Sequence, residues 1–422
     1  MNAQISFLDG TVSLIHIPLS LYSDFLQPIL QVLLPQSQTL KANSSPEELG
    51  SLFQGLTEDQ QHGFLNISVT PLECSIVCHS CWSKSVFEPA IKRLPKELSK
   101  EVSISKDSYT VLSVTSAGMD AGSRVVDLTS PLALAGIPIF FITTYYSDFI
   151  LVPTKDRQSV SKALLSRGFV FSEDESSFRP PTASAHSRGP SQSSGTSSIG
   201  EQQPPSTPPP SNLAELQTRA FSTLKKRNVV PYLEPDLRLV SCSGRENSGL
   251  LHRNGYSEQL RSRKNSNSQG GGPGQNGRGS SISSSGGGLA SWVDTVDTKL
   301  YTGIISALVS QPRFLSVTLA QEDPPSLLLD KELLPIFGDS LVGPTAEGDQ
   351  NLVPIFLDLA SFPFEATGIV SGIAGRLVQD MELRMMESAE LSYLSTARAG
   401  AVILGAEIGE RALGVLRGAV EQ

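Results

Sequence analysis

A short stretch rich in cysteine and histidine, ECSIVCHSCW at 73–82, is the part of the sequence best suited to metal or thiol chemistry. It contains Cys74, Cys78, His79 and Cys81. A structural metal ion needs about four ligands that converge on one point. In a strand, however, Cys74 and Cys78 point to one face, whereas His79 and Cys81 point to the other. We therefore expect buried free thiols here and no metal site.

Other catalytic patterns are also missing from the sequence. It has no GxxxxGK[ST] loop, and no GxGxxG motif follows a predicted strand. The remaining histidines are isolated from one another in the sequence, which gives no support for a Ser-His-Asp arrangement. They are His16, His62, His186 and His252. We expect a protein that is not an enzyme and that needs no cofactor.

The composition narrows the class of protein further. The 422 residues carry a formal net charge of −9, which argues against general nucleic-acid binding through a basic face. No apolar run reaches the roughly 18 residues of a membrane span. With only four cysteines and no N-terminal pattern typical of a secretory signal, we expect a cytoplasmic location without a disulfide framework.

Two segments of low complexity divide the chain. Residues 173–211 are rich in Ser, Pro and Thr, and residues 243–290 are rich in Gly and Ser. Neither contains enough apolar residues to offset the entropy of ordering its backbone, so we expect both to be disordered. The second contains RSRKNS, in which Arg261 and Arg263 precede Ser266 at a spacing that suits phosphorylation by a basophilic kinase. The alternative is a solvated linker without a regulatory role.

The ordered parts alternate between strand and helix patterns in the order β-α-β-β-α-β, which predicts an α+β fold of tandem ferredoxin-like modules. Two copies fit before the first spacer and two after it. A region at 213–242, between the spacers, is predicted as a short helix followed by an extended segment. The expected parts are module 1 at 1–100, module 2 at 101–172, the linker at 173–211, module 3 at 212–340, interrupted at 243–290, and module 4 at 341–422.

An internal repeat supports this plan. TTYYSDFILV (143–152) matches STARAGAVIL (395–404) at a constant offset of 252 residues. Upstream, SRVVDLTSPLALAG matches TGIVSGIAGRL at an offset of 244. Self-similarity of this kind constrains a fold better than a single motif does. The matched helices would begin at Ser123 and Thr367, which are good N-cap residues.

The segments FFITTYYSDFILVP and FPFEATGIVSGIAGRL resemble the Castor-like family of cytosolic arginine sensors, which are built from four ACT modules. The resemblance is specific over residues 109–172 and 353–420. It implies a non-enzymatic sensor that holds a free amino acid between modules 2 and 4. Such a sensor signals by binding a regulatory protein complex in TORC1-type nutrient control.

The resemblance also implies a set of ligand-binding residues at the junction of modules 2 and 4. These are Ile137, Pro138, Ile139, Phe364, Glu365, Ala366, Gly368, Ile369, Val370, Ser395, Thr396 and Gly400. Ala366 and Gly400 stand where the family has acids that read arginine, and Pro138 stands where it has a serine. Each lost hydrogen bond to a charged group weakens binding by about 1.5–3 kcal/mol, so we expect poor arginine binding. Arg398, near the lost acids, could select an acidic or neutral ligand instead.

The turn TTYYSD keeps the family's aromatic and acidic residues, Tyr145, Tyr146 and Asp148. In the family this surface is associated with contact to the partner complex. Two tyrosines and an acid in one exposed turn favour an interface. The alternative is that the tyrosines only cover the sheet edge and the acid caps a turn.

Three hypotheses for function remain open on the sequence. The first is an amino-acid sensor that signals through a partner protein and that self-associates into a homodimer. The second is a scaffold of the same fold that binds no ligand. The third is a separate allosteric subunit of an amino-acid biosynthetic enzyme, because ACT modules often regulate such enzymes.

Overall fold

The computed structural model describes residues 3–34, 63–115, 121–172, 209–245, 297–320, 323–343, 351–364, 366–382 and 390–421. Its first unit, module 1, follows the expected β-α-β-β-α-β order. The strands are β2 (Val12–Ile17), β3 (Phe64–Val69), β4 (Cys74–His79) and β5 (Ser103–Ile104). The helices are α1 (Tyr22–Leu33), the continuous stretch α3 (Ser80–Trp82), η3 (Ser83–Phe87) and α4 (Glu88–Arg93), and the short α5 (Lys96–Ser99).

Module 2 repeats this order. Its strands are β6 (Tyr109–Thr115), β7 (Phe140–Thr143), β8 (Asp148–Pro153) and β9 (Val170–Phe171), and its helices are α6 (Arg124–Leu134) and α7 (Arg157–Leu165). The turn from α7 into β9 depends on Gly168, whose φ of +83° lies in the left-handed region. Glycine is the residue that best tolerates this conformation at the end of a helix.

Modules 3 and 4 form the second half of the chain. Module 3 contains β11 (Leu239–Gly244), α10 (Thr298–Val309), β12 (Leu315–Ala320), β13 (Ser326–Asp330), α11 (Leu334–Phe337) and β14 (Leu341–Val342). Module 4 contains β15 (Leu352–Asp358), α12 (Ile369–Asp380), β16 (Ser392–Ser395), β17 (Ala399–Gly405) and α13 (Ala406–Glu421). These elements confirm the predicted α+β fold built from ACT-like modules.

The modules pair through equivalent edges into two sheets. In modules 1 and 3, β3 pairs with β12 in antiparallel fashion, which gives the order β5-β2-β4-β3-β12-β13-β11-β14. In modules 2 and 4, β7 meets β16 through Ile142 and Leu394, which gives the order β9-β1-β6-β8-β7-β16-β17-β15-β10. The second strand of each module therefore forms the junction in both sheets.

Two strands lie in a different module from the one that the sequence predicted. The N-terminal strand β1 (Gln4–Phe7) pairs with β6 and β9 of module 2, although the prediction placed residues 1–100 in module 1. Likewise β10 (Tyr232–Leu233) pairs with β15 of module 4, although residues 212–340 were predicted to form module 3. In each half of the chain, the first strand thus joins the second module of that half. Their partners are distant in sequence, so local patterns could not reveal them.

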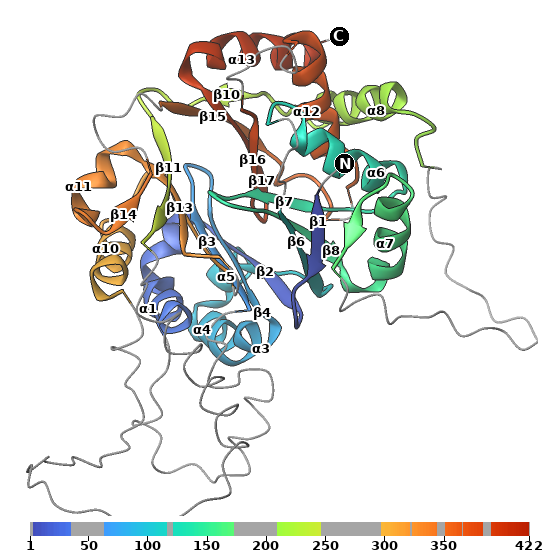
Figure 1. The fold of residues 1–422 in the computed structure, drawn as a ribbon. Helices are drawn as coiled ribbons and strands as arrows, with labels where there is room; N and C mark the ends of the chain where they lie inside the picture. The colour runs from blue at the N-terminus through green and yellow to red at the C-terminus, as the bar shows by residue number, and fades with distance from the viewer. Residues whose placement is uncertain are drawn as a thin grey trace, which may run out of the picture.

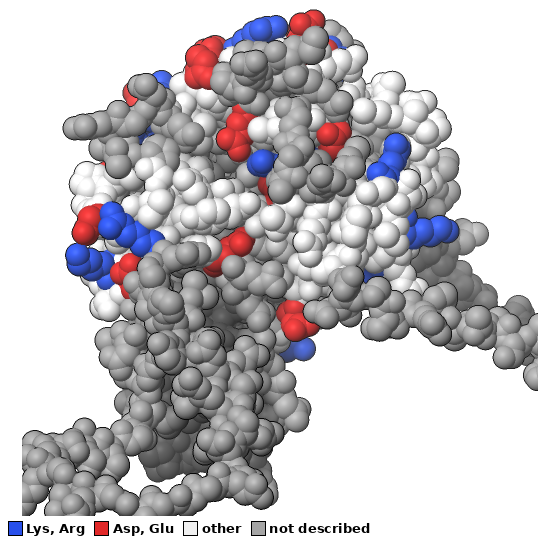
Figure 2. Space-filling model, in the orientation of Figure 1, with Lys and Arg blue, Asp and Glu red and all other residues white. Residues whose placement is uncertain are grey.

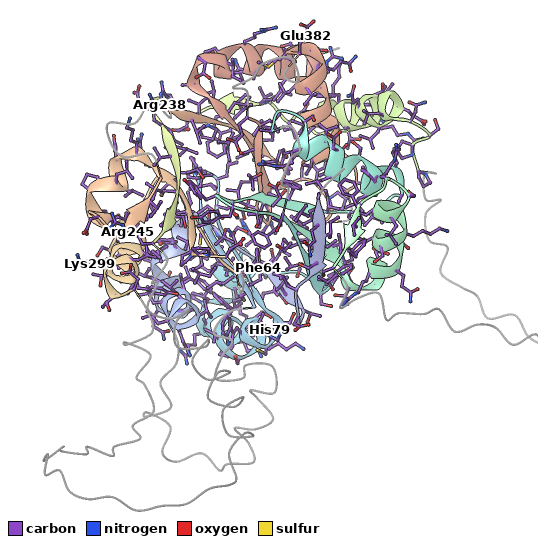
Figure 3. All side chains as sticks on the ribbon, viewed as in Figure 1. Phe64, His79, Arg238, Arg245, Lys299 and Glu382 are labelled. Carbon is purple, nitrogen blue, oxygen red and sulfur yellow. The ribbon has the colours of Figure 1, made fainter. Side chains whose placement is uncertain are left out.

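The two sheets pack face to face, with helices on both outer faces (Figure 1). Helices α6, α7, α12 and α13, together with α8 (Leu213–Lys226), cover the sheet of modules 2 and 4. Helices α1, α4, α10 and α11 cover the other sheet. A third apolar cluster lies between the sheets, where Phe64, labelled near the middle of Figure 3, packs against Phe149 at a ring distance of 5.0 Å.

This four-layer arrangement explains why the strands are so apolar. In each of the strands β2, β3 and β8, all six residues are buried, because a helix layer covers one face of the strand and the second sheet covers the other. On the face shown in Figure 2 basic and acidic groups are interspersed. Among the described residues, no helix combines the length and the apolar character needed to cross a bilayer.

Candidate functional site

The turn between β15 and α12 is the centre of the predicted ligand site. Gly368, not Thr367, is the N-cap of α12, and its φ of +78° requires the left-handed conformation that glycine tolerates. No side chain caps the first turn of this helix. The first N–H groups of a helix have no acceptor within the helix, and the positive end of its dipole lies there. The turn is therefore suited to a carboxylate.

Side chains of module 2 face this turn. The rings of Phe140 and Phe364 lie 6.2 Å apart, and the Phe141 N–H donates to Ser395 Oγ at 2.9 Å. Helices α6 and α12 touch through the hydroxyls of Ser130 and Ser371, which lie 3.0 Å apart. The structure thus brings the predicted segments of modules 2 and 4 together at one junction.

The individual predicted residues differ in burial. Ile137, Ile369, Val370, Ser395 and Thr396 are buried, whereas Pro138, Ile139, Phe364, Ala366 and Gly368 are half-buried. Ile139 and Ala366 pack against the helix-side core of modules 2 and 4. Glu365 lies outside the described residues, as does Ser266. The ligand role of all of these residues stays a prediction.

Tyr393 is a residue of this junction that the sequence reasoning missed. It lies in β16 with 1% of its surface exposed, and its hydroxyl has no hydrogen-bond partner. Burial raises the pKa of this hydroxyl, so it stays protonated. A β carbon on Gly400 would collide with the Tyr393 hydroxyl, so Gly400 leaves the space that the ring occupies. Gly400 pairs with Leu357 near the end of β15, close to where the chain turns toward α12.

Helix α8 covers the same region from outside. It packs against α12, α13 and α6, and its buried face consists of Leu216, Ala220, Phe221 and Leu224. A β carbon on Gly368 would lie 3.3 Å from Leu216 Cγ, and one on Gly372 would lie 2.6 Å from Ala220 Cβ. The sequence predicted this helix but not its position. The glycines at 368, 372 and 375 lie on one face of α12, and this spacing was the sequence signal that another helix packs closely there.

The hairpin turn of module 4 is anchored on module 1 by a buried carboxylate. Glu73 Oε1 accepts hydrogen bonds from Thr396 Oγ1 and from the Arg398 N–H, both at 2.6 Å. Glu73 Oε2 lies 2.5 Å from His16 Nδ1. The Arg398 guanidinium donates to Ser103 Oγ at 3.2 Å. Arg398 therefore points to module 1, which contradicts the suggestion that it selects the ligand.

The equivalent turn of module 2 is anchored on module 3. The Tyr145 N–H donates to Ser326 Oγ at 2.9 Å, just as the Ala397 N–H donates to Ser75 Oγ at 2.9 Å. The rings of Tyr145 and Tyr146 meet edge to face at 4.8 Å, and they are 37% and 46% exposed. The turn therefore joins two modules and also presents two aromatic rings. Partner binding by these rings stays a prediction.

Asp148 does not lie on the exposed turn where the sequence placed it. It is 1% exposed in β8, and its Oδ2 lies 2.6 Å from Arg124 Nε at the start of α6. Burial raises the pKa of Asp148 to about 6, although Arg124 and Thr143 act in the opposite direction. Arg124 also lies 3.5 Å from Glu390 of module 4. Asp148 shares the helix-covered face of β8 with Ile150 and Val152, where Arg124 of α6 lies against it. It therefore cannot contact a partner on the surface as predicted.

The cysteine and histidine stretch lies at the end of β4 and the start of the helix that follows. Cys74 and Cys78 are buried, and burial raises the pKa of both thiols. His79 Nδ1 lies 3.0 Å from Cys81 Sγ at the edge of the molecule (Figure 3). No group of three or more metal-ligating side chains occurs among the described residues.

Comparison with protein families gives one match. Residues 104–166, which contain most of module 2, match the ACT domain model. A comparison with curated proteins finds no match.

Several solved structures are similar at low identity. A protein from Agrobacterium tumefaciens is 18% identical, with 41% of this chain and 93% of that chain covered and a TM-score of 0.25. Aspartate kinase from Synechocystis is 10% identical, with 99% of this chain and 55% of that chain covered and a TM-score of 0.27. The regulatory subunit of aspartate kinase from Thermus thermophilus is 16% identical, with 38% and 95% covered and a TM-score of 0.21.

The domain match and the repeated modules agree with each other. The matched residues contain β6, α6, β7, β8 and α7, and the other three modules repeat this order with equivalent edges at their junctions. ACT domains suggest a regulatory role based on binding a small ligand such as an amino acid. The chain therefore contains one region, residues 104–166, that matches the ACT domain model.

Proposed function

We propose that the protein is a non-enzymatic regulatory protein that binds a free amino acid at the junction of modules 2 and 4. The observation that carries this proposal is the buried Tyr393 hydroxyl, which has no partner and lies beside Gly400. A buried hydroxyl without a partner destabilises the folded protein by about 1–3 kcal/mol. A ligand that accepts its hydrogen bond would remove this penalty.

The ligand carboxylate would bind the N–H groups at the start of α12, where no side chain caps the helix. The Phe364 ring and the half-buried Ile139 and Ala366 would contact the rest of the ligand. Arginine is a poor candidate, because Ala366 and Gly400 provide no acid to pair with a guanidinium. No cofactor is needed for this role.

The resemblance to the Castor-like sensors supports a more specific form of the proposal. In it, the protein is cytoplasmic and reports its ligand to a regulatory protein complex in TORC1-type nutrient control. The exposed rings of Tyr145 and Tyr146 are the surface that we assign to this contact. Self-association into a homodimer is part of the same proposal.

A scaffold without a ligand is the second candidate, and one observation favours it. Leu216 and the Tyr393 ring already occupy the space around Gly368 and Gly400. A scaffold would keep this closed arrangement permanently, and its partners would bind regardless of amino-acid concentration.

A thermal-shift screen of the full chain against each standard amino acid at millimolar concentration separates the two candidates. A ligand at 100 times its Kd stabilises the folded protein by about 2.7 kcal/mol, which raises Tm measurably. We expect one amino acid or a small group to raise Tm, and we expect Tyr393→Phe to reduce that rise. If no amino acid raises Tm, the scaffold becomes the better description.

A further inference from the structure

We propose that the ligand of this site is an aliphatic amino acid and that its side chain takes the place of Leu216, so that α8 is a built-in competitor. This inference rests on the proposed function and names the ligand class and the regulation of the same site. It depends on the chemistry of the residues around the first turn of α12, on the position of α8, and on the unpartnered hydroxyl of Tyr393.

Leu216 covers the turn that would receive the ligand. Its Cγ and both methyl carbons lie 3.3–3.6 Å from a β carbon built on Gly368, the N-cap of α12. The turn is therefore in van der Waals contact with a branched aliphatic side chain in this structure. A ligand that reaches the N–H groups of α12 would have to share this space with Leu216 or displace it.

The surroundings match an apolar side chain. The Phe364 ring lies tilted against Phe140 at 6.2 Å, and Ala366 and Ile139 pack against the same core cluster as the helix of Leu216. Arg398, the basic residue of the adjoining hairpin, is directed at Ser103 of module 1. A charged ligand side chain in this environment would lose its hydration without gaining a partner among these residues. An aliphatic side chain would gain the contacts that Leu216 makes now.

The carboxylate of an amino acid would form hydrogen bonds that the Leu216 side chain cannot form. A leucine side chain forms no hydrogen bond with the Tyr393 hydroxyl, which has no partner, or with the first N–H groups of α12, which no side chain caps. A ligand carboxylate accepts hydrogen bonds from both kinds of donor. The ligand thus replaces the apolar contact of Leu216 and adds polar contacts.

The first turn of α8 is held by local hydrogen bonds from Ser211 to Glu215, whereas the rest of the helix is held by buried contacts with other elements. Leu213 at its start is 37% exposed, and Asn212 caps the helix by accepting from the Glu215 N–H at 2.9 Å. Farther along, Leu224 is fully buried, and the chain beyond α8 is fixed by β10. Helix ends fray at small free-energy cost compared with global unfolding. Displacing Leu216 therefore does not require α8 to leave the molecule.

The test compares wild type with Leu216→Ala and with a matched control, Leu224→Ala, in calorimetric titrations with leucine, isoleucine, valine, arginine and glutamate. Both variants truncate a buried leucine of the same helix, but Leu216 is the one that contacts Gly368. We expect the aliphatic amino acids to bind wild type and arginine and glutamate not to bind. We expect Leu216→Ala to bind them about tenfold more tightly, because one buried leucine no longer has to be displaced.

Hydrogen exchange gives a second readout. Saturating leucine should speed exchange of the amides at 213–217 in wild type and leave those at 221–226 unchanged. Equal affinity of Leu216→Ala and Leu224→Ala would show that Leu216 does not compete and would overturn the proposal. Binding of arginine or glutamate but not of leucine would overturn the ligand class and leave the regulatory function intact. If none of these five amino acids binds to any of the three proteins, the ligand class is overturned, and the proposed function fails only if the thermal-shift screen of all the standard amino acids is also negative.

Discussion

Removing the Glu73 carboxylate should weaken the contact between modules 1 and 4 more than any single neutral hydrogen bond would. In Glu73→Ala, Thr396 Oγ1, the Arg398 N–H and His16 Nδ1 all lose their partner. Each buried donor left without an acceptor destabilises a protein by about 1–3 kcal/mol, so the loss of this shared acceptor should destabilise the protein by about 3–5 kcal/mol. At about 2 °C per kcal/mol for a protein of this size, Tm should fall by roughly 6–10 °C.

The matched control for this prediction is Ser326→Ala. Ser326 accepts from the Tyr145 N–H at the equivalent junction of modules 2 and 3, where the acceptor is a neutral hydroxyl. Its loss should destabilise the protein by about 0.5–1.5 kcal/mol. Differential scanning calorimetry of both variants measures the difference. Equal decreases in Tm would refute the reasoning, because they would mean that the charge of Glu73 contributes nothing beyond an ordinary acceptor.

Three further predictions concern the junction of modules 2 and 4. Burial raises the pKa of Asp148 to about 6 in the folded state. Between about pH 4 and 6 the folded protein therefore binds more protons at this carboxyl than the unfolded chain does. The free energy of unfolding should decrease as pH rises through this window. Asp148→Asn should remove that dependence in urea unfolding at pH 4, 5 and 6, although it leaves Arg124 without its buried partner; an unchanged slope would contradict the assignment. Without ligand, Tyr393→Phe should leave Tm unchanged or raise it, because it removes a buried hydroxyl that has no partner. If the free energy of unfolding fell by more than about 1 kcal/mol, the hydroxyl would have a partner in solution. Gly372→Val should lower the free energy of unfolding by about 1–3 kcal/mol, because the new side chain would collide with Ala220 and separate α8 from α12. Hydrogen exchange of the α8 amides should become faster. Unchanged exchange would show that α8 does not depend on this contact.

The order of strands and helices could be read from the sequence because the signals are local. The apolar runs at 109–115 and 148–153 and the turn residues between them all lie within one module. The resulting ACT-like plan agrees with the domain match at 104–166. The junction of modules 2 and 4 was implied by the resemblance to the Castor-like family and not by a local pattern.

Residues that act across modules could not be assigned in this way. Tyr393 is one aromatic residue among several in apolar strands, and only its burial beside Gly400 makes its hydroxyl significant. Glu73 follows an ordinary turn, and its partners Thr396 and Arg398 are more than 300 positions away. Nothing in the local pattern distinguishes such a residue from a solvated acid.

The sequence by itself determined the repeated modules and the segments of low complexity between them, because both follow from residue types over short stretches. Only the tertiary structure decided that β1 and β10 join the second modules, that α8 lies on the first turn of α12, and that Asp148 is buried. The physical reason is that side-chain exposure depends on what packs above a strand. In this protein a second sheet covers one face of each module, and α6 with Arg124 covers the face on which Asp148 lies.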